Sequence, residues 1–484
     1  MMTDTRAQLL EHATVPATLE TPSIAASGSS LRVFNPATGE EIGQVPQHTS
    51  SDLPAVLSRA EAGAVTARSL SRHQRAVILD GAATRLRDRA EDIAALIVQE
   101  AGKTIRQARK EVSRAANTLG LSAAEARRNA GEVIPFDAYE GSENRTGWYS
   151  REPLGIIAAI TPYNDALNLV AHKLGPAIAG GNSVILKPAQ QTPFTARLLV
   201  ALLTESGLPE EVVTTVHGDR HLAQGIVSAR TVRMVSFTGG FRTGEAVAAS
   251  AGIKRLSMEL GGNAPVLVFA DADLNAAAEA CVSGAFWAAG QNCIGTQRIL
   301  VHRDAYPAFR TAFLARAAEL VTGDPTQEIS DVGPMISAER AEAAWLATTD
   351  AVAAGATLLL GSAPRDAFLP PAVLEGVPHD CSVWAEEVFA PVCTLEAFDS
   401  YEEAVNLANR SEYALHAGVF TRDLSTAMRA ARDLDAGGVM INDSSDYRFD
   451  AMPFGGAKYG SMGREGVRFA YEEMTQPKVV CLTE

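Results

Sequence analysis

The chain has 484 residues, and its 46% hydrophobic and 20% charged residues match a globular protein with a large core, which excludes disorder over most of its length. A net charge of −15 argues against nucleic acid or an anionic membrane as a partner, and no run of about 18 apolar residues predicts a membrane span. The N-terminal residues lack the apolar run of a signal peptide, and five cysteines without a Cys-x-x-Cys pair disfavour a disulfide scaffold and indicate a reducing, cytoplasmic location.

Folded structure is expected to begin near residue 31. Residues 1–30 are rich in Thr, Ala, Ser and Pro, and we predict that they form a mobile arm. A short strand is expected at 31–34. Between residues 52 and 128, apolar residues recur at steps of three and four, which predicts helices that are interrupted at Gly102.

Strand-like and helical segments alternate after Gly131. Residues 155–160 form a continuous apolar run, which is typical of a buried parallel strand. Further strands are predicted at 183–186, 212–216, 234–237, 265–269, 298–302, 357–360, 394–398, 418–420 and 439–441. Helices are predicted at 192–206, 221–228, 274–288, 305–320 and 401–409. This alternation indicates βαβ units, and we predict an α/β fold with two doubly wound domains that meet near residue 260.

Two residues beside glycines are candidates for catalysis. Cys293 has small neighbours, so backbone N–H groups there would lower its thiol pKa; the alternative is a buried structural cysteine. Glu259 stands between apolar residues and precedes a glycine pair. Partial burial would raise its pKa toward that of a general base, whereas the alternative is a carboxylate that caps backbone N–H groups.

Polar residues follow three predicted strands, at the edge where open α/β sheets bind ligands. Residues 161–164 follow the first strand and end in Asn164, whose amide could donate to an oxyanion. Lys187 follows the second strand. Gly240 and Gly244 follow the third and open a helix whose N-terminus could hold a pyrophosphate, although the spacing is not the G-x-G-x-x-G of ordinary dinucleotide-binding folds.

Eight motifs, in their order along the chain, resemble those of the NAD(P)-dependent aldehyde dehydrogenase superfamily. They begin at Phe34, Thr161, Lys187, Phe237, Met258, Gly290, Glu386 and Pro453 and read FNPATG, TPYN, KPA, FTGG, MELGGN, GQNC, EEVFAP and PFGG. The resemblance covers the chain from Phe34 onward. It implies that residues 31–136 and 152–259 form an NAD(P)-binding domain and residues 260–469 the catalytic domain. Residues 137–151 and 470–484 would form a small β element for assembly into a homodimer or homotetramer.

The resemblance also implies roles for individual residues. Cys293 would attack the aldehyde carbon, and the Asn164 amide would hold the resulting oxyanion together with a backbone N–H. Transfer of hydride to the nicotinamide would leave a thioester, and Glu259 would activate the water that hydrolyses it to the free acid. Contacts with NAD or NADP are implied for Thr161, Pro162, Lys187, Ala189, Gln190, Gly240, Gly244, Leu260, Gly261, Glu387 and Phe389.

Three residues depart from the common family pattern. Gln190 stands where many NAD-specific members have a glutamate that binds the ribose hydroxyls. Without that charge a 2′-phosphate is repelled less, so NAD and NADP both stay open as cofactors. Gly240 replaces a common serine and removes a hydroxyl contact to phosphate, and Ala390 replaces a frequent glycine.

Within the superfamily, three segments resemble the branch of lactaldehyde, phosphonoacetaldehyde, phosphonoformaldehyde and non-phosphorylating glyceraldehyde-3-phosphate dehydrogenases. Arg114 matches an arginine that reaches the substrate's phosphorus oxyanion in two of these groups. The alternative is that Arg106, Lys110 and Arg114 form one solvated helix face. Asn292 stands where those enzymes usually have arginine, and Asp165 where the phosphonoacetaldehyde type has histidine, so the expected pocket loses positive charge.

Arg448 could compensate for that loss, or it could pair with Asp446 or Asp450. We therefore predict that the substrate is a short aldehyde with a phosphonate, phosphate or carboxylate group. A phosphonate substrate would place the enzyme in phosphonate metabolism. Lactaldehyde and succinate semialdehyde are the alternative substrates.

Two other functional classes compete with an acid-forming dehydrogenase. A non-catalytic, crystallin-like binding or structural relative would lack the nucleophile or the base, yet Cys293, Glu259 and Asn164 are all present. Members that pass the acyl group to coenzyme A generally lack the glutamate found here. His217 and His221 are four residues apart, but the intervening Gly218 argues for a loop, so no metal site is predicted.

Overall fold

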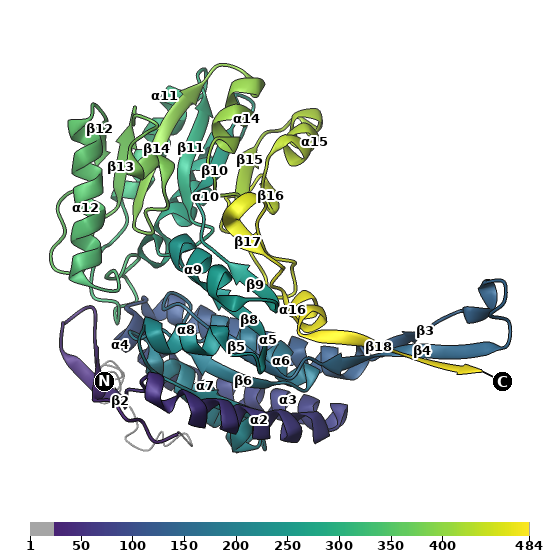
Figure 1. The fold of residues 1–484 in the computed structure, drawn as a ribbon. Helices are drawn as coiled ribbons and strands as arrows, with labels where there is room; N and C mark the ends of the chain where they lie inside the picture. The colour runs from purple at the N-terminus through teal and green to yellow at the C-terminus, as the bar shows by residue number, and fades with distance from the viewer. Residues whose placement is uncertain (1–23, 484) are drawn as a thin grey trace.

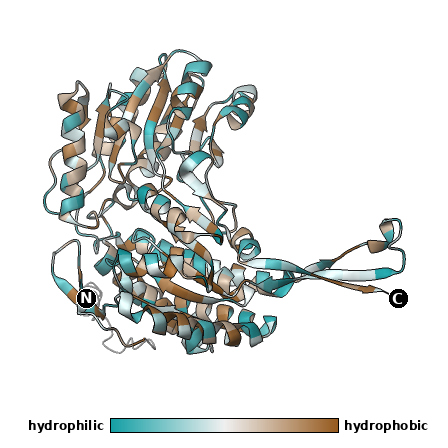
Figure 2. Cartoon of the chain, in the orientation of Figure 1, coloured by the Kyte–Doolittle hydropathy of each residue, from teal (hydrophilic) through white to brown (hydrophobic). Residues whose placement is uncertain are grey.

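The structure, a computed structural model, describes residues 24–483. Within them, two large sheets form the body of the molecule, one above the other in Figure 1, and helices cover both faces of each sheet. The predicted α/β class with parallel sheets is confirmed. Figure 2 shows that hydrophobic residues concentrate on the strands of both sheets, inside the helical layers.

The first described residues are attached to the body. Of the predicted arm, residues 1–23 lie outside the described residues. The backbone N–H of Ser27 donates to Asp52 at 3.2 Å, and Nε2 of His48 lies 3.2 Å from the carbonyl oxygen of Ile24, so these residues contact the body. The antiparallel pair β1 (Ser30–Phe34) and β2 (Glu41–Pro46) follows.

A six-stranded sheet in the N-terminal half has the order β17-β9-β8-β5-β6-β7. Its strands are β17 (Ser461–Met462), β9 (Arg255–Glu259), β8 (Val232–Thr238), β5 (Ile156–Ile160), β6 (Ser183–Lys187) and β7 (Val213–Thr215). All pair in parallel except β17, which is antiparallel to β9. The alternation along β5 shows why the sheet needs two helical layers: Ile157 and Ala159 pack into one core, while Ile156 and Ala158 pack into another on the opposite face.

Helices on the first face belong to the larger core and are α3 (Arg72–Asp88), α4 (Ala90–Ala101), α5 (Ile105–Arg128), α6 (Asn168–Gly180) and α7 (Pro193–Glu205). Helices on the opposite face are α2 (Leu53–Ser69), α8 (Arg220–Ser228) and α9 (Phe241–Ala251). The short 3₁₀ turns are η1 (Ser50–Asp52), η2 (Phe136–Ala138), η3 (Glu210–Val212), η4 (Trp287–Gly290) and η5 (Lys458–Gly460).

A seven-stranded sheet in the C-terminal half has the order β12-β13-β14-β11-β10-β15-β16. Its strands are β12 (Thr357–Leu360), β13 (Ala372–Glu375), β14 (Val392–Phe398), β11 (Thr296–His302), β10 (Ala264–Val268), β15 (His416–Phe420) and β16 (Gly438–Ile441). Only β12 runs antiparallel to its neighbour. One face packs against α10 (Leu274–Phe286), α11 (Tyr306–Ala318), α12 (Ala338–Ala353) and α13 (Ser382–Ala385), and the other against α14 (Tyr401–Asn409) and α15 (Leu424–Asp433).

A β arm projects from the body (Figure 1). It consists of β3 (Gly131–Val133), β4 (Arg145–Pro153) and β18 (Thr475–Thr483), and β18 follows the last helix, α16 (Val467–Glu473). The arm leaves several large hydrophobic side chains exposed, namely Val133, Tyr139, Trp148, Val479 and Leu482.

No helix in the described part of the chain combines the length and the apolar character that a membrane span requires.

Candidate active site

The carboxyl ends of neighbouring parallel strands bring the predicted residues to one edge of the six-stranded sheet. Residues 161–164 follow β5, Lys187 ends β6, and Glu259 ends β9. The register pairs Ile160 of β5 with Lys187 on one side and with Phe237 of β8 on the other. These segments therefore share the edge at which open α/β sheets bind ligands, as the sequence predicted.

Asn164, Glu259 and Cys293 are far apart in the sequence but line one cavity of about 380 Å³. Glu259 ends β9 of the six-stranded sheet, and Asn164 lies in the loop after β5 of the same sheet. Cys293 comes from the loop before β11 of the other sheet. Five predicted cofactor residues line the same cavity: Pro162, Gly240, Gly261, Glu387 and Phe389. The cavity thus lies between the two halves of the molecule and draws on both.

The loop that carries Cys293 has a constrained backbone. The helix predicted over 274–288 ends two residues early, and residues 288–290 follow with φ angles of 52°, 54° and 66°. The first two of these are alanines, for which a positive φ is costly, so the surroundings must hold this turn. Gln291 does so, because its side chain donates to the carbonyl of Ala288 at 3.3 Å and accepts from the backbone N–H of Ile336 at 2.9 Å. A rigid turn therefore delivers Cys293 to the cavity.

Burial controls the acid–base properties of the two candidate catalytic residues. Glu259 is 2% exposed, and burial raises its pKa well above the usual value, with further help from Glu465. Neither of its carboxylate oxygens has a hydrogen-bond partner among the described residues, so it does not cap backbone N–H groups. Burial also raises the pKa of the Cys293 thiol, and Arg448 opposes this effect. The prediction of a lowered thiol pKa is therefore wrong in this structure, because burial outweighs the nearby positive charge.

A buried ionic network lies beside Glu259. Its centre is Glu465, which accepts hydrogen bonds from Arg448 at 3.0 Å, Lys173 at 3.3 Å and the Thr238 hydroxyl at 3.1 Å. The two cations lower the pKa of Glu465 despite its burial, so this carboxylate stays ionised. Glu259 is therefore the protonatable carboxyl group of the pair.

Arg448 takes a position that the sequence left open. It pairs with Glu465 rather than with Asp446 or Asp450, and its guanidinium stacks on Phe454 at 3.6 Å from the ring centroid. Its Nε has no hydrogen-bond partner among the described residues.

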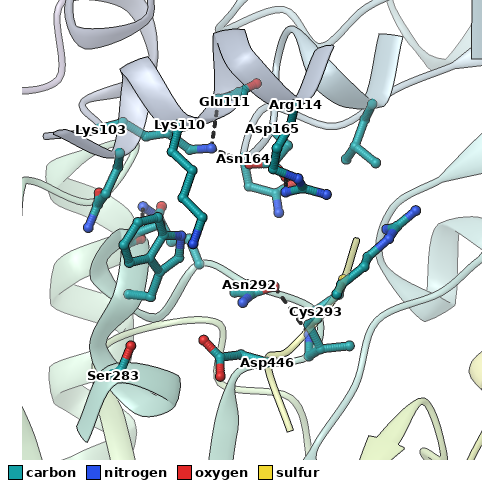
Figure 3. A pocket seen from close by; sticks show the side chains of 17 residues that line it. Lys103, Lys110, Glu111, Arg114, Asn164, Asp165, Ser283, Asn292, Cys293 and Asp446 are labelled. Atoms are coloured by element: carbon teal, nitrogen blue, oxygen red, sulfur yellow. Dashed lines mark hydrogen bonds and ion pairs between the residues drawn. The ribbon is translucent and has the colours of Figure 1, made fainter. Parts of the chain in front are cut away.

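A second, smaller cavity of about 120 Å³ opens on Cys293 from the side of α5 (Figure 3). All four predicted substrate-binding residues line it: Arg114, Asp165, Asn292 and Arg448. Asn164 and Cys293 line both cavities, so a molecule in the smaller one reaches the same thiol. Because one water needs about 10–15 Å³ of such space, this cavity suits only a short substrate.

Arg114 is directed into the smaller cavity and is not part of a solvated helix face. Its side chain is 24% exposed, and it donates to Asp165 at 3.3 Å and to Asp450 at 3.1 Å. Arg106, two turns earlier on α5, is half exposed and pairs with Asp331. The alternative of one solvated face is therefore wrong for Arg114.

Two residues of the smaller cavity were not predicted from the sequence to bind substrate. Lys103, just before α5, is buried and forms ion pairs with Glu111 at 2.6 Å and with Asp165. Asp446 was considered only as a partner for Arg448. No local signal marks either residue, because the segments that surround them are distant in the sequence.

Gly240 and Gly244 shape the start of α9 at the sheet edge. Gly240 is the N-cap residue, so the helix N-terminus faces the cavity and suits a pyrophosphate. Gly244 allows close packing, because a Cβ there would approach Cδ2 of Leu260 to 2.3 Å.

The residues after β5 and β6 lie at the same edge of the sheet. Lys187 is largely buried, which lowers its pKa. Ala189 and Gln190 follow it, and the Gln190 amide donates to the carbonyl of Gly218 at 3.1 Å. The hydroxyl of Thr161 is buried without a hydrogen-bond partner among the described residues. A polar group of a dinucleotide fits beside such an unpartnered hydroxyl.

Glu387 and Phe389 complete the larger cavity. Glu387 accepts from the backbone N–H of Gly262 at 2.9 Å, and burial raises its pKa to about 8. Its carboxylate lies against Gly261, where a Cβ would come within 2.4 Å of it. Phe389 has a φ of 52°. Its ring lies edge-on to the ring of Tyr163, and the two ring centroids are 6.1 Å apart. Within residues 24–483, no group of three or more His, Cys, Asp or Glu side chains is arranged to hold a metal ion.

Comparison with known proteins identifies the family of the chain. Residues 24–480 match the aldehyde dehydrogenase family. The chain is 60% identical over 93% of its length to the aldehyde-dehydrogenase-like protein y4uC of Sinorhizobium fredii, covering 88% of it. It is 59% identical over 93% of its length to aspartate-semialdehyde dehydrogenase 1 of Pseudomonas canavaninivorans, covering 96% of it. Among solved structures, aldehyde dehydrogenase 21 of Physcomitrella patens, in complex with the reaction product succinate, superposes with a TM-score of 0.92 at 35% identity, over 95% of this chain and 96% of that one.

Relatives in the predicted branch, among them a lactaldehyde dehydrogenase and a glyceraldehyde-3-phosphate dehydrogenase complexed with NADP, also match nearly the whole chain. The enzyme oxidises aldehydes to acids and uses NAD or NADP. The chain belongs to the aldehyde dehydrogenase family.

Proposed function

We propose that this enzyme oxidises a short aldehyde that carries a carboxylate to the free acid, and that aspartate semialdehyde is its substrate. The observation that carries the proposal is that Arg114 and Cys293 line the same small cavity. An arginine can bind a carboxylate through paired hydrogen bonds, which would place the aldehyde at the other end of a short chain beside the thiol.

Two relatives support a four-carbon acid. One is named an aspartate-semialdehyde dehydrogenase, and the structure of another contains the product succinate. A carboxylate is preferred to a phosphonate or phosphate group, because neutral Asn292 and acidic Asp165 stand where the phosphonoacetaldehyde type has arginine and histidine. The cations of the lining are Lys103, Lys110, Arg114 and Arg448.

Covalent catalysis by Cys293 accounts for the residues that surround it. Its sulfur would bond to the aldehyde carbon as the thiolate, after the thiol proton has passed to solvent, and the oxyanion would accept a hydrogen bond from the Asn164 amide. Bound in the larger cavity, the nicotinamide would accept the hydride that the carbon loses. Glu259 would then take a proton from water, whose oxygen attacks the thioester; the carbon–sulfur bond breaks, and the free acid leaves.

We propose that the cofactor occupies the larger cavity and extends along the edge of the six-stranded sheet. The start of α9 at Gly240 would bind the pyrophosphate, Lys187 and Gln190 the adenosine ribose, and Glu387 and Phe389 the nicotinamide end. The predicted limits of the NAD(P)-binding domain, residues 31–136 and 152–259, and of the catalytic domain, residues 260–469, belong to the same proposal.

The β arm is proposed as the oligomerisation element. Val133, Tyr139, Trp148 and Val479 are 44–82% exposed on it, and exposed apolar groups on a projecting element are typical of an interface. A homodimer or homotetramer would cover them. A reducing, cytoplasmic location is also proposed, since all five cysteines are free and Cys293 must stay a thiol.

Steady-state kinetics test the proposed substrate. Reduction of NAD and of NADP would be followed with aspartate semialdehyde, succinate semialdehyde, phosphonoacetaldehyde, lactaldehyde and propanal. We expect the highest kcat/KM with the carboxylate-bearing aldehydes. Equal efficiency on propanal would refute the proposal, and a preference for phosphonoacetaldehyde would reassign the anionic group.

A further inference from the structure

We propose that Asp446 binds an ammonium group of the substrate, so that the enzyme selects an amino-substituted semialdehyde acid over an unsubstituted one. The inference rests on the proposed function, oxidation of a short carboxylate-bearing aldehyde. It adds to that function the residue that would distinguish aspartate semialdehyde from succinate semialdehyde, which differ only by the amino group.

The ion pairs around the smaller cavity single out Asp446. Three carboxylates line this cavity, and two of them have cationic partners: Glu111 pairs with Lys103, and Asp165 pairs with both Lys103 and Arg114. Asp446 forms no ion pair with any residue in the described part of the chain. Its side-chain hydrogen bond comes from a neutral group, the hydroxyl of Ser444.

A cation on the substrate would satisfy this carboxylate. Burial raises the pKa of Asp446; the charge of Asp443 adds to this effect, and the charge of Lys110 opposes it. Lys110 forms no ion pair with Asp446, and its Nζ lies over the ring of Trp287 at 4.6 Å from the centroid. A substrate ammonium that donates to Asp446 would form a charge-assisted hydrogen bond in a partly desolvated site.

Side chains of opposite charge lie on opposite sides of the cavity, which is what a zwitterionic substrate needs. Figure 3 shows Lys110 and Arg114 reaching in from α5, with Asp446 on the opposite side and Asn292 between them. A carboxylate on the Arg114 side and an ammonium on the Asp446 side would orient a short chain in one way. Succinate semialdehyde would use the first contact and leave Asp446 without a cation.

Kinetics with two matched substrates test the inference. The full-length enzyme, Asp446→Asn, Asp446→Glu and the control Asp380→Asn would be assayed with aspartate semialdehyde and with succinate semialdehyde. Asn removes the charge at nearly constant shape and Glu retains it. Asp380 is an exposed acid that lines neither cavity.

We expect the wild type to favour aspartate semialdehyde, and we expect Asp446→Asn to reduce the ratio of the two kcat/KM values by about 10- to 100-fold. Asp446→Glu should recover part of that ratio, and Asp380→Asn should leave it unchanged. An equal loss on both substrates would show a structural role, and an unchanged ratio would show that Asp446 does not bind the ammonium; either result overturns the inference.

A wild-type preference for succinate semialdehyde would also overturn it, while leaving the proposed carboxylate-bearing substrate class intact. Equal activity on propanal would refute the substrate class itself, whatever the Asp446 variants do. Turnover of succinate semialdehyde by Asp446→Asn shows in the same experiment that the variant is folded.

Discussion

Replacement of Arg114 by methionine is the most direct test of how the enzyme holds its substrate. A guanidinium has five N–H donors, and three of them are engaged in this structure, one with Asp165 and two with Asp450. The two that remain are enough for one carboxylate. Hydrogen bonds to charged groups contribute about 1.5–3 kcal/mol, so we expect kcat/KM for succinate semialdehyde to fall by about 10- to 100-fold.

The Arg114→Met variant should remain folded although it loses two ion pairs. Asp450 keeps its hydrogen bonds with His172 and Asn168, each at 3.2 Å, and Asp165 keeps its ion pair with Lys103. We therefore expect the free energy of unfolding to fall by about 1–3 kcal/mol, measured by urea denaturation.

The assay compares succinate semialdehyde with propanal, which has no carboxylate. Arg114→Met should lose efficiency on the first substrate and keep most of it on the second. Arg106→Met is the control, because Arg106 lies on the same helix but pairs with Asp331 near the surface, where an ion pair contributes less than about 1 kcal/mol. An equal loss on propanal, or no loss on either substrate by a folded variant, would refute the role given to Arg114.

Three further predictions concern other parts of the molecule. Glu259→Gln should release one equivalent of NAD(P)H in a burst and then turn over about 10²- to 10⁴-fold more slowly, because hydrolysis of the thioester lacks its general base. Rapid-quench kinetics would show the burst, and its absence would contradict this role. Gln190→Glu should lower kcat/KM for NADP by about tenfold or more and for NAD by less, because it adds a negative charge beside the 2′-phosphate; equal losses for both cofactors would count against this position. Burial lowers the pKa of His217 from 6.5 to about 3, so the unfolded chain binds a proton there that the folded chain does not, and thermal stability should fall as the pH drops below 6.5 toward 3. His217→Asn should flatten that dependence, and an unchanged pH profile would show that His217 does not contribute.

Much of the fold could be predicted because its signals are local. The apolar run at 155–160 becomes β5, and the helix predicted at 401–409 has the observed bounds of α14. The strand-end residues also follow from local order, since the carboxyl ends of parallel strands must meet at one edge. The helix predicted over 274–288 extends beyond the observed end of α10, because alanine has good helix propensity. Tertiary contacts instead hold Ala288 and Ala289 at positive φ.

The sequence by itself determined the α/β class, the family and the three candidate catalytic residues Cys293, Glu259 and Asn164, because these depend on hydrophobic periodicity and on short motifs. The tertiary structure alone decided the charge environment. It decided that Arg114 faces a cavity while Arg106 lies near the surface, that burial raises the pKa of Cys293, and that Asp446 lacks a cationic partner. The physical reason is that burial and ion pairing depend on which distant segments enclose a side chain, and no local pattern records this.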